Sequence, residues 1–163
     1  MKRIQINIDV EALAMDELPA DERELVEQAV AATDNAYAPY SNFFVGAAAR
    51  LDNNRIVMGA NQENAAFPSG LCAERTALFA AQAQYPESAV TALAIAARNA
   101  NGLLDAPISP CGACRQVILG VEDRYKNNIK ILLYGKSGVY RLGSARELLP
   151  FSFVDASMTG DAE

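Results

Sequence analysis

Hydrophobic residues recur along the chain with two periods, one typical of helices and one of strands. After an acidic start that follows Pro19, apolar positions such as Leu25, Ala29 and Ala32 repeat at helical spacing. A stretch rich in alanine, residues 72–84, suits a helix that packs closely on a sheet. Helices are predicted in four segments: from Pro19 to about Ala36, Cys72–Gln84, Cys111 to about Tyr125, and a short one from Ser144 to before Pro150.

Strand signals lie between these helices. Residues 90–97 are continuously apolar, as expected for a strand that is buried on both faces. Two strands joined by the turn residues 52–54 form a predicted hairpin. The predicted strands are 44–51, 55–61, 90–97, 129–134 and 139–142, and the alternating Ile4, Ile6 and Ile8 predict a further short edge strand.

Helices and strands in this order predict an α/β fold, a three-layer α/β/α sandwich on a mixed sheet of about five strands. No repeat, low-complexity tract or Pro/Gly linker divides the sequence, so residues 1–163 are expected to form one domain. Residues 1–18 extend beyond this pattern as an appendage, and the sequence assigns them no role.

Composition and charge exclude several function classes. The net charge is -6 and no block of Lys or Arg occurs, which argues against a nucleic-acid partner and against binding to anionic membranes. No apolar run approaches the roughly 18 residues of a membrane span. Asn7, Asp9 and Glu11 interrupt any signal-type apolar stretch near residue 1, so we expect a cytosolic protein.

The candidate chemistry rests on cysteine, because the chain contains no His at all. Its three cysteines, Cys72, Cys111 and Cys114, make a poor disulfide framework because their number is odd. Cys111 and Cys114 form a C-x-x-C pair, which alone is compatible with a redox pair, half of a zinc site or unrelated core cysteines. Pro110 before the pair, a predicted helix after it and the sequence Cys72-Ala73-Glu74 favour the zinc site.

Three thiolates fill three corners of a tetrahedral zinc and leave the fourth open, which is the mark of a catalytic zinc. Both cysteine positions lie at predicted helix starts, where negative charge is favoured and thiol pKa falls. A zinc ion lowers the pKa of a bound water toward neutrality. A carboxylate must then move protons, and Glu74 is the candidate. A lone glutamate on a helix is usually just solvated, but Glu74 stands between Cys72 and Arg75 in a helix that reads as buried.

The pattern Cys72-x-Glu74…Pro110-Cys111-x-x-Cys114 is that of zinc deaminases acting on nucleobases. From roughly Ala36 to Phe153 the sequence resembles the small homotetrameric, three-cysteine cytidine deaminases. The segments that carry the resemblance are AYAPYSNF (36–43), VGAA (45–48), NQENAA (61–66), CAERTA (72–77), SPCGACRQ (109–116) and ELLP (147–150).

This resemblance implies hydrolytic deamination of cytidine and 2′-deoxycytidine to the uridine nucleosides and ammonia, in pyrimidine salvage. It implies that Cys72, Cys111 and Cys114 bind one Zn²⁺ per chain and that Glu74 protonates N3 and relays the proton of the water. The backbone NH of Ala73 is expected to meet the pyrimidine O2, and the Ser109 carbonyl is expected to meet the amino group.

The same resemblance implies further substrate contacts. Asn61 and Glu63 resemble the pair that holds the ribose 3′-hydroxyl, which would make the 2′-hydroxyl dispensable. Phe43 resembles the aromatic that faces the base. Phe153 resembles a ring supplied by a neighbouring subunit of a homotetramer with shared active sites, and core packing is the alternative for both rings.

Arg75 resembles the arginine that donates to the zinc thiolates and withdraws part of their charge, with a surface ion pair as the alternative. The sequence departs from the family pattern at Phe67, where a Tyr is frequent, and at Phe151, where a small residue is usual.

Four other functions compete, and of these a deaminase acting on bases in RNA or DNA is disfavoured by the acidic balance and the absence of basic stripes. A deaminase of another aminated heterocycle need not keep Phe43, Asn61 and Glu63. A zinc-stabilised interaction domain needs a fourth ligand and no Glu74, and a redox C-x-x-C protein has no use for Cys72.

Overall fold

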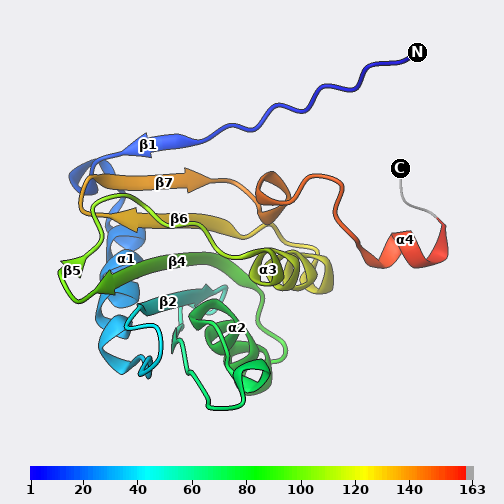
Figure 1. Cartoon of the computed structure of the whole chain (residues 1–163). Helices are drawn as coiled ribbons and strands as arrows, with labels where there is room; N and C mark the ends of the chain where they lie inside the picture. Colours follow the sequence, from blue (N-terminus) through cyan, green and yellow to red (C-terminus); the bar gives the residue numbers. More distant parts are fainter. Residues whose placement is uncertain (161–163) are drawn as a thin grey trace.

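A single mixed sheet forms the centre of the molecule in the computed structural model, which describes residues 1–160 (Figure 1). Its strands follow the order β1-β7-β6-β4-β2-β3, and β5 pairs with the end of β4. Only β4 and β6 run parallel, and the other neighbouring pairs are antiparallel. The strands are β1 (Glu11–Leu13), β2 (Phe44–Leu51), β3 (Ile56–Ala60), β4 (Val90–Asn99), β5 (Gly102–Leu103), β6 (Lys130–Gly135) and β7 (Gly138–Leu142).

Helices cover the two faces of this sheet, which confirms the predicted three-layer α/β/α architecture. Helix α1 (Ala20–Ala32) packs on one face, and α2 (Ala73–Gln84) and α3 (Gly112–Tyr125) lie side by side on the other (Figure 1). The short helix α4 (Asp155–Thr159) stands apart from the sheet and was not predicted. Among residues 1–160, no helix combines the length and the apolar content needed to cross a membrane.

The sheet has seven strands, so the prediction of about five was too low. The five predicted strands are present within one or two residues of their expected bounds. The two missed strands, β1 and β5, are three and two residues long, too short to show a period in the sequence. They become strands because each lies beside an unpaired backbone edge. Strand β1 pairs with the edge of β7, and β5 pairs with the end of β4.

The predicted edge strand over Ile4, Ile6 and Ile8 was wrong. The paired strand of this appendage comes later, at Glu11–Leu13, and the three isoleucines are exposed. Apolar alternation reports which residues share a face, but pairing depends on which backbone reaches the edge of β7.

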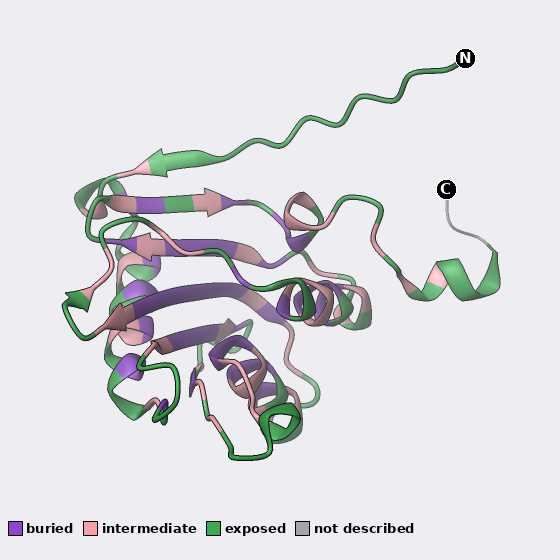
Figure 2. Ribbon diagram, in the orientation of Figure 1, coloured by how far each residue is buried: buried purple, intermediate pink, exposed green. Residues whose placement is uncertain are grey.

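The buried residues form two layers, one on each side of the sheet (Figure 2). Small residues let the helices approach the strands closely. A Cβ at Gly46 in β2 would overlap the Ala29 carbonyl oxygen of α1, and a Cβ at Gly59 in β3 would lie 2.5 Å from the Ala73 carbonyl oxygen of α2. Gly59 therefore lets the first turn of α2 rest directly on the sheet, which fixes the position of that helix start.

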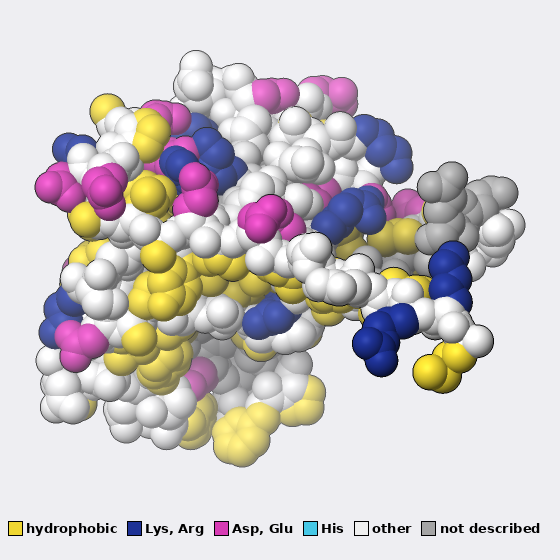
Figure 3. Space-filling view, turned by 90° about the horizontal axis from the view of Figure 1, so that it is seen from above, with side chains coloured by type: hydrophobic (Ala, Val, Ile, Leu, Met, Phe, Trp, Pro, Cys, Tyr) yellow, Lys and Arg dark blue, Asp and Glu magenta, His cyan; other side chains and the backbone are white. Residues whose placement is uncertain are grey.

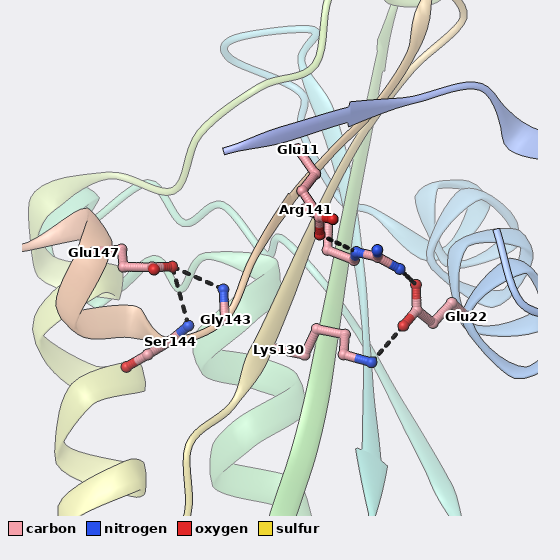
Figure 4. Close-up of polar contacts among 7 residues, drawn as sticks. All are labelled: Glu11, Glu22, Lys130, Arg141, Gly143, Ser144 and Glu147. Atoms are coloured by element: carbon pink, nitrogen blue, oxygen red, sulfur yellow. Dashed lines mark hydrogen bonds and ion pairs between the residues drawn. The ribbon is translucent and has the colours of Figure 1, made fainter. Parts of the chain in front are cut away.

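A buried carboxylate ties β1, α1 and two strands together (Figure 4). Glu22 of α1 is 4% exposed and pairs with Lys130 of β6 and with Arg141 of β7, whose Nη1 lies 3.0 Å from Glu22 Oε2. Arg141 Nε also donates to Glu11 Oε2 in β1, at 2.6 Å. Because Glu22 has two cationic partners, its burial is compensated, and Arg141 links the short strand β1 to the body of the molecule.

The predicted helix after Ser144 is present as a 3₁₀ turn over Ala145–Leu148. Its cap is the expected one, since Ser144 Oγ accepts from Arg146 N at 3.1 Å. Glu147 completes the cap, because its Oε2 accepts from the backbone N of Gly143 at 2.7 Å and of Ser144 at 3.3 Å (Figure 4).

Candidate functional site

The three cysteines meet where α2 and α3 begin. Cys72 is the N-cap residue of α2, Cys111 is the N-cap residue of α3, and Cys114 lies in the first turn of α3. Both helices start on the same face of the sheet, so residues about forty positions apart come together. Their three Sγ atoms all lie within 4.8 Å of one another, and all three thiols are free.

The donor set fits a zinc ion. Thiolates about 2.3 Å from a tetrahedral zinc are separated from one another by about 3.8 Å, which the observed cluster accommodates with small adjustments. Cys114 is fully buried, whereas Cys111 is exposed, so one side of the cluster is closed by protein and the other is open. Within residues 1–160 this is the only group of candidate metal-binding side chains found. An open side is what a catalytic metal site requires.

The surroundings of the cysteines favour the thiolate form at Cys72. A hydrogen bond from Cys114 lowers the pKa of Cys72 to about 5, with a further contribution from Arg75. The pKa of Cys114 is raised in turn, because this thiol supplies that hydrogen bond and is buried. The negative charge of the pair therefore rests on Cys72, as expected for two sulfurs that share a proton.

Arg75 contacts the cluster through its guanidinium group. Its Nη2 donates to Cys72 Sγ at 3.3 Å, and this hydrogen bond raises the pKa of Arg75. Its Nε is buried without a hydrogen-bond partner among the described residues. No carboxylate pairs with Arg75 in this part of the chain, so its position differs from that of an ordinary surface ion pair.

Glu74 is 5% exposed and lies in the first turn of α2, two residues after Cys72. Burial raises the pKa of its carboxyl group, and the nearby charge of Cys72 raises it further. A solvated surface glutamate would show neither effect. A carboxyl group with a raised pKa beside a metal site is suited to exchange protons near neutral pH.

A cleft of about 310 Å³ opens in front of the cluster. It brings together residues from four separate parts of the sequence, and most of the predicted substrate contacts lie on its walls. The lining residues are Ser41, Phe43, Val45, Asn61, Glu63, Cys72, Ala73, Glu74, Ile108, Ser109 and Cys111. The volume suits a small ligand of nucleoside size.

Asn61 and Glu63 are held rigidly by backbone groups. Asn61 Oδ1 accepts from Val45 N at 2.8 Å, and its Nδ2 donates to the Phe43 carbonyl at 2.9 Å. Glu63 Oε2 accepts from Tyr40 N at 2.8 Å and from Ser41 N at 3.3 Å. Hydrogen bonding from Ser41 and Tyr40 lowers the pKa of Glu63, so it is an ionised acceptor at the cleft wall.

Sequence reasoning missed several members of the site. Ser41, Val45 and Ile108 line the cleft, and each is adjacent or next but one to a residue that was predicted. Arg115 was quoted only as part of a motif. Its Nε donates to the Pro110 carbonyl at 2.9 Å and its Nη1 donates to the Leu148 carbonyl at 2.8 Å, so it fixes the loop that precedes Cys111.

Phe153 does not reach the cleft of its own chain. Phe153 is 60% exposed, and its carbonyl accepts from Gln116 Nε2 of α3 at 2.8 Å. The segment that carries it leads outward to α4 (Figure 1). Core packing, the alternative considered for this ring, is therefore excluded within one chain.

Phe67 borders a second hollow of about 370 Å³ that shares Ser41 and Glu63 with the cleft. Its ring is 74% exposed and stands edge-on to Tyr40, with 5.5 Å between the ring centroids. Phe67, one of the two residues at which the sequence departs from the family pattern, thus lies beside the cleft and not on its wall.

Known proteins are similar to this chain in sequence and in fold. The family described as "Cytidine and deoxycytidylate deaminase zinc-binding region" matches residues 19–126. The cytidine deaminase of Halalkalibacterium halodurans is 37% identical over 138 residues, which cover 85% of this chain and 98% of that protein. The cytidine deaminase of Sporosarcina psychrophila is 36% identical over 143 residues, which cover 88% of this chain and 98% of that protein.

A solved structure agrees with these relatives. The crystal structure of cytidine deaminase from Burkholderia pseudomallei superposes with a TM-score of 0.67 at 41% identity, covering 80% of this chain and 97% of that one.

Proposed function

Because the chain belongs to the cytidine and deoxycytidylate deaminase family, we propose that it is a zinc-dependent hydrolase that converts cytidine and 2′-deoxycytidine to uridine and 2′-deoxyuridine with release of ammonia. The observation that carries the proposal is the convergence of three free thiols and the buried Glu74 on one nucleoside-sized cleft. The direct test is to incubate the purified protein with cytidine and to quantify uridine and ammonia together.

Cys72, Cys111 and Cys114 would hold the zinc, with the open side of the cluster facing the cleft. When bound, zinc supplies a Lewis acid that lowers the pKa of a bound water toward neutrality. The protein supplies the proton transfers. Glu74 takes one proton from the attacking water and gives it to N3 of the cytosine ring; once the water oxygen is bonded to C4, Glu74 takes the second proton from that oxygen and passes it to the departing amino group. Water and cytidine thereby become uridine and ammonia.

Backbone groups orient the base. Ala73 is the first residue of α2, so its N–H has no partner within the helix and is available to the pyrimidine O2. The Ser109 carbonyl lies at the cleft wall, where it can accept from the exocyclic amino group. Phe43 forms the wall that faces the base.

The ribose is assigned to Asn61 and Glu63, and this assignment gives a prediction about the sugar. If Glu63 accepts from the 3′-hydroxyl, 2′-deoxycytidine is turned over within about tenfold of cytidine, whereas 3′-deoxycytidine loses about 10- to 100-fold in kcat/KM, the value of one hydrogen bond to a charged group. The measurement is kcat/KM for the three nucleosides, on the wild-type protein and on Glu63→Ala.

Glu63→Ala is expected to respond equally to cytidine and 3′-deoxycytidine, because the acceptor is gone. A 2′-deoxycytidine rate thousands of times below that of cytidine would contradict the assignment, as would a Glu63→Ala protein that still discriminates against 3′-deoxycytidine.

Arg75 is assigned to the thiolates, and removing it is predicted to impair the reaction while the metal stays. Arg75→Gln is expected to lose about 10- to 100-fold in activity, as other partners of metal ligands do, because more negative charge then remains on Cys72. Kinetics and zinc content are measured on the same preparations. Arg75→Lys keeps the charge without the planar guanidinium. Its activity should lie between the activities of the wild type and of Arg75→Gln. Full activity of Arg75→Gln would show that the contact with Cys72 is incidental.

We also propose a homotetramer in which Phe153 of one chain completes the site of a neighbour. Two observations support this: the resemblance to the homotetrameric deaminases, and a ring that is exposed in its own chain while its backbone is held by Gln116. Pyrimidine salvage in the cytoplasm is the proposed setting. The three free thiols support it, since a reducing compartment keeps such ligands available.

A further inference from the structure

The segment 2–10, here named the arm, presents a row of apolar side chains to solvent. Ile4, Ile6, Ile8 and Val10 alternate with polar residues and are 69%, 48%, 45% and 47% exposed. The arm is extended, and among the described residues no backbone hydrogen bond joins residues 2–9 to another segment. An alternating row of this kind is typical of a strand with one covered face, and here each of the four side chains stays exposed.

The base of the arm is anchored. Strand β1 follows it directly and pairs with β7, and Glu11 is bonded to Arg141, which also contacts the buried Glu22 (Figure 4). From this base the arm runs outward past the end of β7 (Figure 1). Figure 3, which looks down on the molecule from this side, shows hydrophobic and basic side chains standing out at the projecting right-hand end.

We propose that the arms of two copies of this chain pair as antiparallel strands about a twofold axis at Ile6. In this register Ile4 of one copy faces Ile8 of the other, and Gln5 faces Asn7. The basic end of the arm meets the acidic end, because Arg3 faces Asp9. Each apolar residue except Val10 therefore meets another apolar residue, and opposite charges meet on the other face.

The register follows from the alternation and from existing bonds. In an antiparallel pair, the numbers of the two residues that face each other always add to the same sum. The apolar residues of the arm have even numbers, so they face one another only if this sum is even. A sum of 12 sets Arg3 opposite Asp9, and a sum of 14 sets it opposite Glu11. Glu11 is already bonded to Arg141 at 2.6 Å, whereas Asp9 forms no ion pair within residues 1–160. The sum of 12 therefore uses an available carboxylate.

A two-stranded ribbon alone is marginally stable in water, and the chain offers a surface to support it. Ile6 lines a hollow of about 550 Å³ together with Phe151, Val154 and Ala156 from the segment that leads to α4. Phe151 is 86% exposed. The apolar face of the paired arms can thus rest on this segment. No arm residue lines the catalytic cleft, so the pairing does not depend on the proposed deaminase chemistry, although the supporting segment also carries Phe153.

A cysteine at the axis tests the pairing directly. In the zinc-loaded full chain, Ile6→Cys is expected to form a disulfide-linked dimer under mild oxidation, because residue 6 faces its own copy. Glu87→Cys, an exposed site far from the arm in sequence, is the matched control and should give no more dimer than the wild type. Absence of a dimer above that background for Ile6→Cys would overturn the proposal, since an arm that folds onto its own chain cannot cross-link.

Exchanging the charges tests the direction and the register. Arg3→Asp sets two carboxylates opposite each other twice and, introduced into Ile6→Cys, is expected to slow association of the arms about tenfold, as measured by the rate at which the disulfide-linked dimer forms. Arg3→Asp combined with Asp9→Arg restores the opposite charges and should restore association. If the double variant associates no better than the single one, the antiparallel register about Ile6 is wrong, and the proposed deaminase chemistry is unaffected.

Discussion

Glu74→Gln is expected to lower kcat for cytidine by about 10²- to 10⁴-fold, the usual contribution of a positioned proton-transfer group. Glutamine keeps the size of the side chain but can neither give nor take the proton. The loss should appear in kcat more than in KM, because orientation of the base is assigned to the backbone of Ala73 and Ser109 and not to Glu74. The measurement is steady-state turnover of cytidine, with zinc content determined on the same samples.

The matched control is Glu27→Gln, an exposed glutamate on α1 at the opposite face of the sheet, which should keep full activity. Glu74→Gln should also keep its zinc, because Glu74 does not belong to the sulfur cluster. Wild-type turnover by Glu74→Gln would remove the proton-transfer assignment and favour a zinc-stabilised interaction domain, for which this residue is dispensable.

Cys111→Ser is expected to release the zinc and to abolish turnover with it. Removing a residue that only hydrogen-bonds a metal ligand already lowers metal affinity about 10- to 100-fold. Removing a ligand itself must lower the affinity further. Cys111 is the best choice because it is the exposed cysteine, whereas replacing the buried Cys114 also disturbs the core. Zinc per chain is measured by elemental analysis after dialysis against a moderate chelator.

A second readout separates loss of metal from loss of fold. Added zinc should raise the Tm of the wild type, since a ligand that binds only the native state stabilises it, and should leave the Tm of Cys111→Ser nearly unchanged. A Cys111→Ser protein that holds one zinc per chain as firmly as the wild type would contradict the three-thiolate site.

Much of the fold could be predicted because most elements carry a clear period. The strand 90–97 is continuously apolar and residues 72–84 are rich in alanine, so both were placed within two residues. The predictions that failed concern segments whose structure depends on residues distant in the sequence. Glu11–Leu13 is a strand only because Arg141 and its neighbours on β7 offer an unpaired edge. No local signal distinguishes that segment from the isoleucines before it.

The candidate site was predictable for a different reason. Cys72, Glu74 and Cys111 form a motif whose chemistry restricts what they can do, and the structure brings them to one cleft. The supporting contacts could not be predicted, because they join side chains to the backbone across the fold. Arg115 donates to the Leu148 carbonyl. Asn61 accepts from the backbone N of Val45 in β2 and donates to the carbonyl of Phe43, the residue before β2. A sequence shows the type of these residues but not what they reach.

The most direct test of the central proposal is the turnover of cytidine by the zinc-loaded wild-type protein, with uridine and ammonia quantified together. The expected result is steady conversion with one ammonia released per uridine formed, and loss of activity on chelation that added zinc reverses. A folded protein that holds one zinc per chain and forms no uridine would contradict the assignment of cytidine as its substrate.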